Sequence, residues 1–243
     1  MRVILKNELA SLFWKIQGFI EMFKKIMLDH IEVILYNKKN LVDYDFNIWG
    51  LDMNTEQIYL ESTKKQFLYY KTLGEAAINQ VESEQLFETF NDDSNSIATI
   101  VKHLSGNMLS RWTDFLNSDG EKSWRDRDSE FENDIETKDE LLMKWDEGWT
   151  CLLNAIDSIT PDQLLQIVYI RNEGHTIIEA INRQLAHYPY HVGQIIYAAK
   201  ILKKSSWESL SVPKNHSKQY NNDKFSKERA IKNFIDEELN KSK

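Results

Sequence analysis

Residues 177–203, IIEAINRQLAHYPYHVGQIIYAAKILK, carry the helical pattern that decides the fold. Their apolar residues recur every three or four positions, which is typical of a helix with one buried face. Thr176 and Glu179 form a capping box at the start of the pattern. Pro189 lies inside it and predicts a bend, because proline removes one backbone hydrogen bond. The stretch therefore predicts one long, bent helix that ends near Lys203.

Three further long helices are predicted upstream of this one. The same spacing of apolar residues extends over about 54–82, 96–116 and 137–159. The last of these segments begins with a second capping box, formed by Thr137 and Glu140. Long helices joined by loops of medium length are typical of helix bundles. We therefore expect an all-α protein built as a four-helix bundle.

The connections between these helices are polar or short. Residues 117–136 are rich in Asp, Ser and Glu and predict a loop. Thr160, followed by proline, predicts one or two helical turns. The β-branched and aromatic residues 167–171 favour a short extended piece. These features agree with a helical domain that has little sheet.

The chain is expected to divide into three parts. Two interpretations stay open for residues 1–52: an amphipathic helical extension, or a segment upstream of a native start at Met53. Residues 53–213 form the bundle domain. Residues 214–243 form a short polar C-terminal tail, whose end, from 224 onward, is either a weak helix or frayed.

Composition excludes several classes of function. The 243 residues have a formal net charge of −8, and no segment concentrates Lys and Arg, which argues against nucleic acid as a partner. No apolar run reaches the roughly 20 residues of a membrane span, and no signal peptide is evident. We therefore expect a cytoplasmic protein without membrane contact. The single cysteine, Cys151, lies in an apolar stretch and is interpreted as a core residue.

Histidines are the candidates for chemistry. His187 and His191 are four residues apart, so both imidazoles lie on one face of the last long helix. His103 lies at the edge of the apolar stripe of the 96–116 helix. In a bundle, three such imidazoles form a metal site with one open position. The alternative is three half-buried imidazoles with ordinary hydrogen bonds, but no carboxylate lies at helical spacing to pair with them, which favours a cation.

Other common catalytic patterns are absent. No histidine has a glutamate three residues before it, as the carboxylate-bridged di-iron bundles require. HExxH, GxxxxGK[ST], GxGxxG and GxSxG are also missing. The sequence therefore argues against a nucleotide-binding protein, a zinc peptidase and a serine hydrolase.

His103 and the string NRQLAHYPYHVGQ at 182–194 resemble the DinB-like (YfiT-type) metalloenzyme superfamily. The resemblance is closest to an uncharacterised bacterial subgroup, in which Trp207 and a Leu-Ser-Val-Pro segment follow. It covers about residues 53–221. It implies up-down-down-up connectivity and a divalent metal, zinc or nickel. Because members are often dimers, it also implies a homodimer. The implied ligands are His103, His187 and His191.

The resemblance also implies a reaction. Relatives with assigned activities use the metal to activate a low-molecular-weight thiol, as in bacillithiol S-transferases and mycothiol-dependent maleylpyruvate isomerases. We therefore expect a metal-dependent enzyme that transfers a bacillithiol-like thiol to an electrophilic small molecule. Asn107, Arg183 and Gln194 are candidate contacts to substrate or ligands. The alternative is a non-catalytic, stress-related binding or scaffold protein in which the metal only holds the bundle together.

Overall fold

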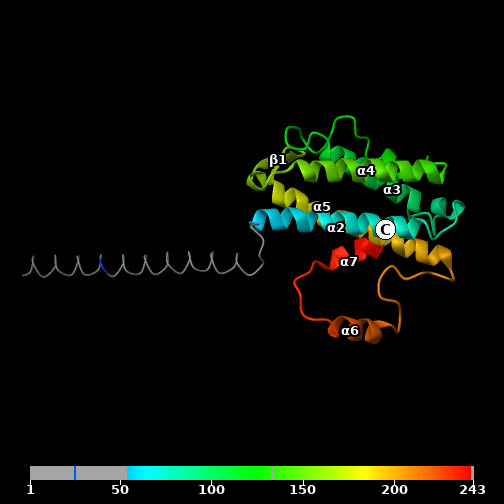
Figure 1. The fold of residues 1–243 in the computed structure, drawn as a ribbon. Helices are drawn as coiled ribbons and strands as arrows, with labels where there is room; N and C mark the ends of the chain where they lie inside the picture. Colours follow the sequence, from blue (N-terminus) through cyan, green and yellow to red (C-terminus); the bar gives the residue numbers. More distant parts are fainter. Residues whose placement is uncertain (1–24, 26–53, 133, 242–243) are drawn as a thin grey trace, which may run out of the picture. The chain divides into compact units, whose positions relative to one another are not determined.

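The computed structural model describes residues 25, 54–132 and 134–241 (Figure 1). Apart from Lys25, the expectations for residues 1–52 lie outside the described residues. The predicted four-helix bundle is confirmed, and each helix begins and ends within a few residues of its predicted bounds. The four helices are α2 (Thr55–Ile78), α3 (Ile97–Trp112), α4 (Lys138–Ser158) and α5 (Ile177–Lys203).

Helices α2 and α5 run in the same direction. Near the start of both helices, the hydroxyl of Tyr59 donates to the side-chain oxygen of Asn182 at 2.8 Å. Further along both helices, the rings of Phe67 and Tyr188 are in contact, with centroids 5.9 Å apart. Because the contacting positions increase along both helices together, α2 and α5 are parallel.

Helix α4 runs in the opposite direction to α2. The Nζ of Lys64 lies 2.5 Å from a carboxylate oxygen of Asp157, near the end of α4. The Nζ of Lys71, further along α2, lies 2.8 Å from a carboxylate oxygen of Asp146, which is earlier in α4. As the position along α2 increases, the position of its partner along α4 decreases, so the two helices are antiparallel.

Helices α3 and α4 are parallel, and a glycine lets them approach closely. Lys102, in the first half of α3, pairs at 2.5 Å with Asp134, just before α4. Gly148, in the middle of α4, faces Ser105; a Cβ at this glycine would lie 2.9 Å from the Cα of Ser105. Together with the previous pairs, this gives the up-down-down-up connectivity that the resemblance implies.

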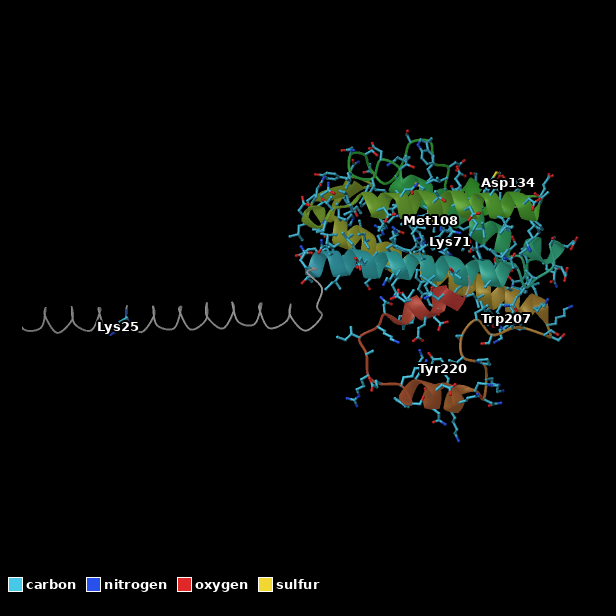
Figure 2. The ribbon with its side chains drawn as sticks, in the orientation of Figure 1. Lys25, Lys71, Met108, Asp134, Trp207 and Tyr220 are labelled. Atoms are coloured by element: carbon cyan, nitrogen blue, oxygen red, sulfur yellow. The ribbon has the colours of Figure 1, made fainter. Side chains whose placement is uncertain are left out.

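Large apolar side chains from all four helices fill the interior of the bundle. Met108, labelled in Figure 2, is among the residues that are almost completely buried. The largest fully buried side chains are Trp145, Trp149, Tyr188 and Phe67. Because burial of each such side chain contributes about 1.5–3 kcal/mol, this core contributes strongly to holding the helices together.

A β-hairpin links α4 to α5. Strand β1 (Ile167–Ile170) pairs in antiparallel fashion with β2 (Glu173–Thr176) through a two-residue turn. Both turn residues, Arg171 and Asn172, have left-handed φ angles, 56° and 62°, as tight hairpin turns require. The predicted extended piece is confirmed. The second strand was not predicted, because its sequence, EGHT, has no alternation of apolar residues.

The C-terminal part contains two further helices, α6 (Ser217–Phe225) and α7 (Phe234–Lys241). Helix α7 packs on α2: the ring of Phe234 meets that of Tyr69 edge to face, with centroids 5.8 Å apart, and Ile235 is fully buried. The helical alternative for the chain end is therefore correct over α7. Among the described helices, none is both long and apolar enough to cross a membrane.

Candidate metal centre

Three imidazoles meet between α3 and α5. His103 comes from the middle of α3, and His187 and His191 come from successive turns of α5. One ring nitrogen from each histidine lies within 4.8 Å of the others. The Nε2 atoms of His187 and His191 are 3.1 Å apart. The structure thus brings together the three ligands that the sequence predicts.

His103 is held by a buried charged pair. Its Nδ1 donates to Oε2 of Glu130 at 2.8 Å, and both side chains are 6% exposed. Arg125 binds both oxygens of the same carboxylate, at 2.7 Å from Nε and 2.9 Å from Nη2. Burial opposes ionisation, but the hydrogen bonds from His103 and Arg125 outweigh it and hold the pKa of Glu130 below its ordinary value. The carboxylate is therefore ionised and fixes the orientation of the imidazole.

Two neighbours shape the contact between His103 and Glu130: Gly106 leaves room for it, and Phe131 covers the imidazole. A Cβ at Gly106, one turn after His103 on α3, would lie 2.8 Å from Cδ of Glu130. Glycine is thus the residue that lets the carboxylate lie against the helix. The ring of Phe131 stacks on that of His103, with centroids 4.9 Å apart. Gly106 belongs to α3 itself, and Phe131 belongs to the segment that follows it.

The two imidazoles of α5 are held by neutral partners on their own helix. Nδ1 of His187 donates to Oε1 of Gln184 at 3.2 Å, and Nδ1 of His191 donates to Oε1 of Gln194 at 2.8 Å. Each glutamine is three residues from its histidine, so the helix itself sets the spacing. In the tautomer with the proton on Nδ1, each ring presents the lone pair of its Nε2 to the cluster.

The protein environment favours the uncharged form of these two rings. Burial, reinforced by the neighbouring histidines and by Arg111 and Arg183, lowers the pKa of His187 to about 4. Burial also lowers the pKa of His191, although the hydrogen bond to Gln194 opposes this shift. Both imidazoles are therefore neutral at physiological pH, which is the form that binds metals.

The residues fit a divalent metal with one open position. The Nε2 atoms of His187 and His191 face each other at 3.1 Å, a distance at which the two rings share either a proton or a cation. Two nitrogen ligands of a tetrahedral zinc ion, each about 2.1 Å from it, lie roughly 3.4 Å apart, close to the distance seen. Three protein nitrogens leave the fourth position of such a site for water or substrate.

The further predicted contacts have different positions. Gln194 supports His191. Asn107 is buried in α3 and accepts a hydrogen bond from the hydroxyl of Tyr188 at 3.1 Å. Arg183 is exposed on α5, one turn before His187.

Sequence reasoning missed several residues of the centre. No carboxylate lies at helical spacing from the imidazoles, as expected, but Glu130 reaches His103 from a loop, where helical spacing gives no signal. Gln184 lies at helical spacing from His187, so that signal was present in the sequence. Arg125 and Phe131 share the loop with Glu130, and nothing in their local pattern indicated the site.

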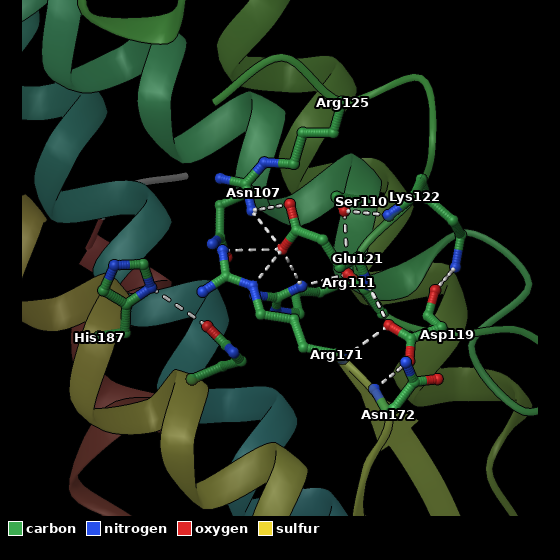
Figure 3. Close-up of polar contacts among 12 residues, drawn as sticks. Asn107, Ser110, Arg111, Asp119, Glu121, Lys122, Arg125, Arg171, Asn172 and His187 are labelled. Atoms are coloured by element: carbon green, nitrogen blue, oxygen red, sulfur yellow. Dashed lines mark hydrogen bonds and ion pairs between the residues drawn. The ribbon is translucent and has the colours of Figure 1, made fainter. Parts of the chain in front are cut away.

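A network of charges connects this loop to the β-hairpin (Figure 3). Glu121 is bound by three guanidinium groups, at 3.0 Å from Arg111, 3.3 Å from Arg125 and 3.1 Å from Arg171. Arg125 is shared with Glu130, so the network reaches from the hairpin turn to His103. Glu121, Arg125 and Glu130, all from the predicted loop, thus belong to the surroundings of the centre.

Comparison with known proteins gives one family. Residues 54–216 match the family described as "Protein of unknown function (DUF1572)". None of the curated proteins matches the chain. Because the match covers well over half of the chain, the protein belongs to this family. All three histidines of the cluster lie within the matched residues.

Proposed function

We propose that the protein is a DinB-like metal-binding protein that holds zinc or nickel through His103, His187 and His191. The observation that carries this proposal is the convergence of three imidazoles whose outer nitrogens are all occupied. Each outer partner accepts a hydrogen bond, which leaves the inner nitrogens free to coordinate. The family match and the resemblance of residues 182–194 to DinB-like proteins support the same assignment.

We further propose that the protein is an enzyme that transfers a low-molecular-weight, bacillithiol-like thiol to an electrophilic small molecule. A divalent metal with three neutral ligands keeps its full charge, and so stabilises a thiolate or lowers the pKa of a bound water. The chain itself holds the ligand rings in fixed orientations through Glu130, Gln184 and Gln194. Fixed rings keep the open position in one place, which favours reaction with a bound thiol.

The alternative is a scaffold protein in which the metal is structural. The centre joins α3 to α5, so a bound ion cross-links two helices and stabilises the bundle. The two functions differ in whether the fourth position is open to a ligand. A thiol that binds the metal-loaded protein supports the enzyme; a melting temperature that collapses on chelation, without any thiol binding, supports the scaffold.

The first test is elemental analysis of untagged protein purified without added metal. We expect near-stoichiometric zinc or nickel in the wild type and its loss in His103→Ala and His187→Ala. The second test is the rate of conjugation of low-molecular-weight thiols to several electrophiles. Rates that are the same in wild type and His191→Ala would remove the transferase proposal but leave metal binding intact.

Three further expectations belong to this proposal. We propose a cytoplasmic homodimer that acts on a small molecule and binds no nucleic acid. Exposed apolar residues on α5 offer a face for a second copy, since Tyr190 and Tyr197 are 61% and 69% exposed. Light scattering of the purified protein measures the number of copies. Salt-dependent retention on DNA would contradict the expectation about nucleic acid.

A further inference from the structure

An exposed arginine lies beside the metal centre without a partner. Arg183 precedes His187 by four residues, so it lies on the same face of α5, one turn away. It has no hydrogen bond or ion pair with any residue that the structure describes. The acid one turn before it, Glu179, is engaged in the capping box, where its carboxylate accepts from both the amide and the hydroxyl of Thr176 at 2.8 Å.

A second exposed arginine, Arg127, lies near the centre, in the loop that follows α3. The guanidinium carbon of Arg127 lies 5.1 Å above the ring of Phe131, and that ring stacks on His103. Its ion pair with Asp128 is long, at 3.9 Å, and joins side chains that are 52% and 100% exposed. Such a pair contributes little, so this guanidinium is also available to a ligand.

Among the residues that the structure describes at the centre, no negative charge is left unpaired. Imidazoles bind a metal in their neutral form and bring no charge to it, and the carboxylate of Glu130 is paired with Arg125. A bound divalent metal would add two positive charges there. The loaded centre would therefore be electropositive within a chain whose formal net charge is −8. Such a field favours an anionic ligand over a neutral one of the same shape.

We infer that the thiol used at this centre carries a carboxylate, which Arg183 binds while the sulfur occupies the open metal position, with Arg127 as a weaker contributor. This inference rests on the proposed thiol transfer and names the class of its co-substrate. Arg183 is the specificity-determining residue, because it lies beside a ligand of the metal and has a free planar guanidinium that matches a carboxylate.

The test uses the cobalt(II)-loaded protein and two thiols of the same length, mercaptopropionate and its neutral amide. Binding of thiolate to cobalt produces a charge-transfer absorption, which gives a dissociation constant without any turnover. We expect wild type to bind mercaptopropionate about fivefold more tightly than the amide, the size of an exposed ion pair. Arg183→Gln should reduce this ratio to about one and leave the affinity for the amide unchanged, and Arg183→Lys should keep part of it.

Lys200→Gln is the matched control, since it removes one positive charge from an exposed position of α5 more than two turns beyond His191. It should keep the wild-type ratio. A ratio near one in wild type, or a ratio that Arg183→Gln does not lower, overturns the inference while thiol binding itself stands. If neither thiol changes the cobalt spectrum, the proposed thiol transfer fails as well.

Discussion

The two sides of the metal centre are built differently. On the α5 side, two histidines and two glutamines share one helix, and every contact joins residues three or four apart. On the α3 side, His103 depends on Glu130, which is 27 residues further along the chain and needs Arg125 to stabilise its charge. One side is local and neutral; the other is long-range and charged.

This difference teaches which parts of the centre depend on the rest of the fold. The α5 side forms whenever the helix forms, because helical spacing sets its geometry. The α3 side exists only when the 113–137 loop is folded, and it buries two charges that need each other. We therefore expect substitutions on the α3 side to affect both metal binding and stability, and substitutions on the α5 side to affect metal binding alone.

Loss of a ligand is the largest expected effect, and it should be equal on both sides. His103→Ala and His187→Ala should each reduce bound metal to background after dialysis, because two imidazoles rarely hold a divalent ion against competition. Elemental analysis measures this. His216→Ala, at an exposed position outside the cluster, is the control and should keep full metal content. Full metal in either variant would mean that the cluster is not the site.

Glu130→Gln should separate the two sides most clearly. The amide keeps the shape of the carboxylate but leaves the charge of Arg125, whose side chain is 2% exposed, without its main partner. We expect metal affinity to fall about tenfold to a hundredfold. We also expect the metal-free protein to lose about 3 kcal/mol of unfolding free energy. Metal competition assays and urea unfolding measure these quantities. An unchanged stability would show that the charged pair contributes little to the loop.

Two glycines give a matched pair for the same comparison. Gly106→Ala places a methyl group against the carboxylate of Glu130, whereas a Cβ at Gly193 on α5 has no neighbour within 4 Å. We expect Gly106→Ala to lower metal affinity about tenfold, because Glu130 must move. Gly193→Ala should leave affinity unchanged and stabilise α5 by about 0.5–1 kcal/mol. Equal effects of the two substitutions on metal titrations would contradict the role given to Gly106.

Gln194→Ala is expected to have the smallest effect. It removes the hydrogen bond that orients His191 but leaves no buried charge, since this glutamine is neutral and half-buried. Metal affinity should fall by about tenfold or less, and the unfolding free energy of the metal-free protein should stay the same. Gln166→Ala, at an exposed position before the hairpin, is the control. A loss of stability comparable to that of Glu130→Gln would remove the contrast between the two sides.

The predictable parts of the fold are those with local signals. The capping boxes at Thr137 and Thr176 mark helix starts that the structure reproduces, since each hydroxyl accepts from the amide three residues later. The predicted long helix is one continuous element, α5, with Pro189 inside it. The second strand had no such signal, because its pairing depends on the partner strand and on Asp119, whose carboxylate accepts from both amides of the Arg171–Asn172 turn.

By itself, the sequence determined the helices, their buried faces and the pair His187 and His191, because periodicity and spacing follow from the geometry of one helix. The tertiary structure alone decided that Glu130, held by Arg125, contacts His103. That contact joins α3 to a loop residue 27 positions later in the chain. It therefore depends on how the loop packs against the helix. The stability of a buried ion pair depends on the groups that surround it in the folded protein, and these cannot be read from the neighbouring sequence.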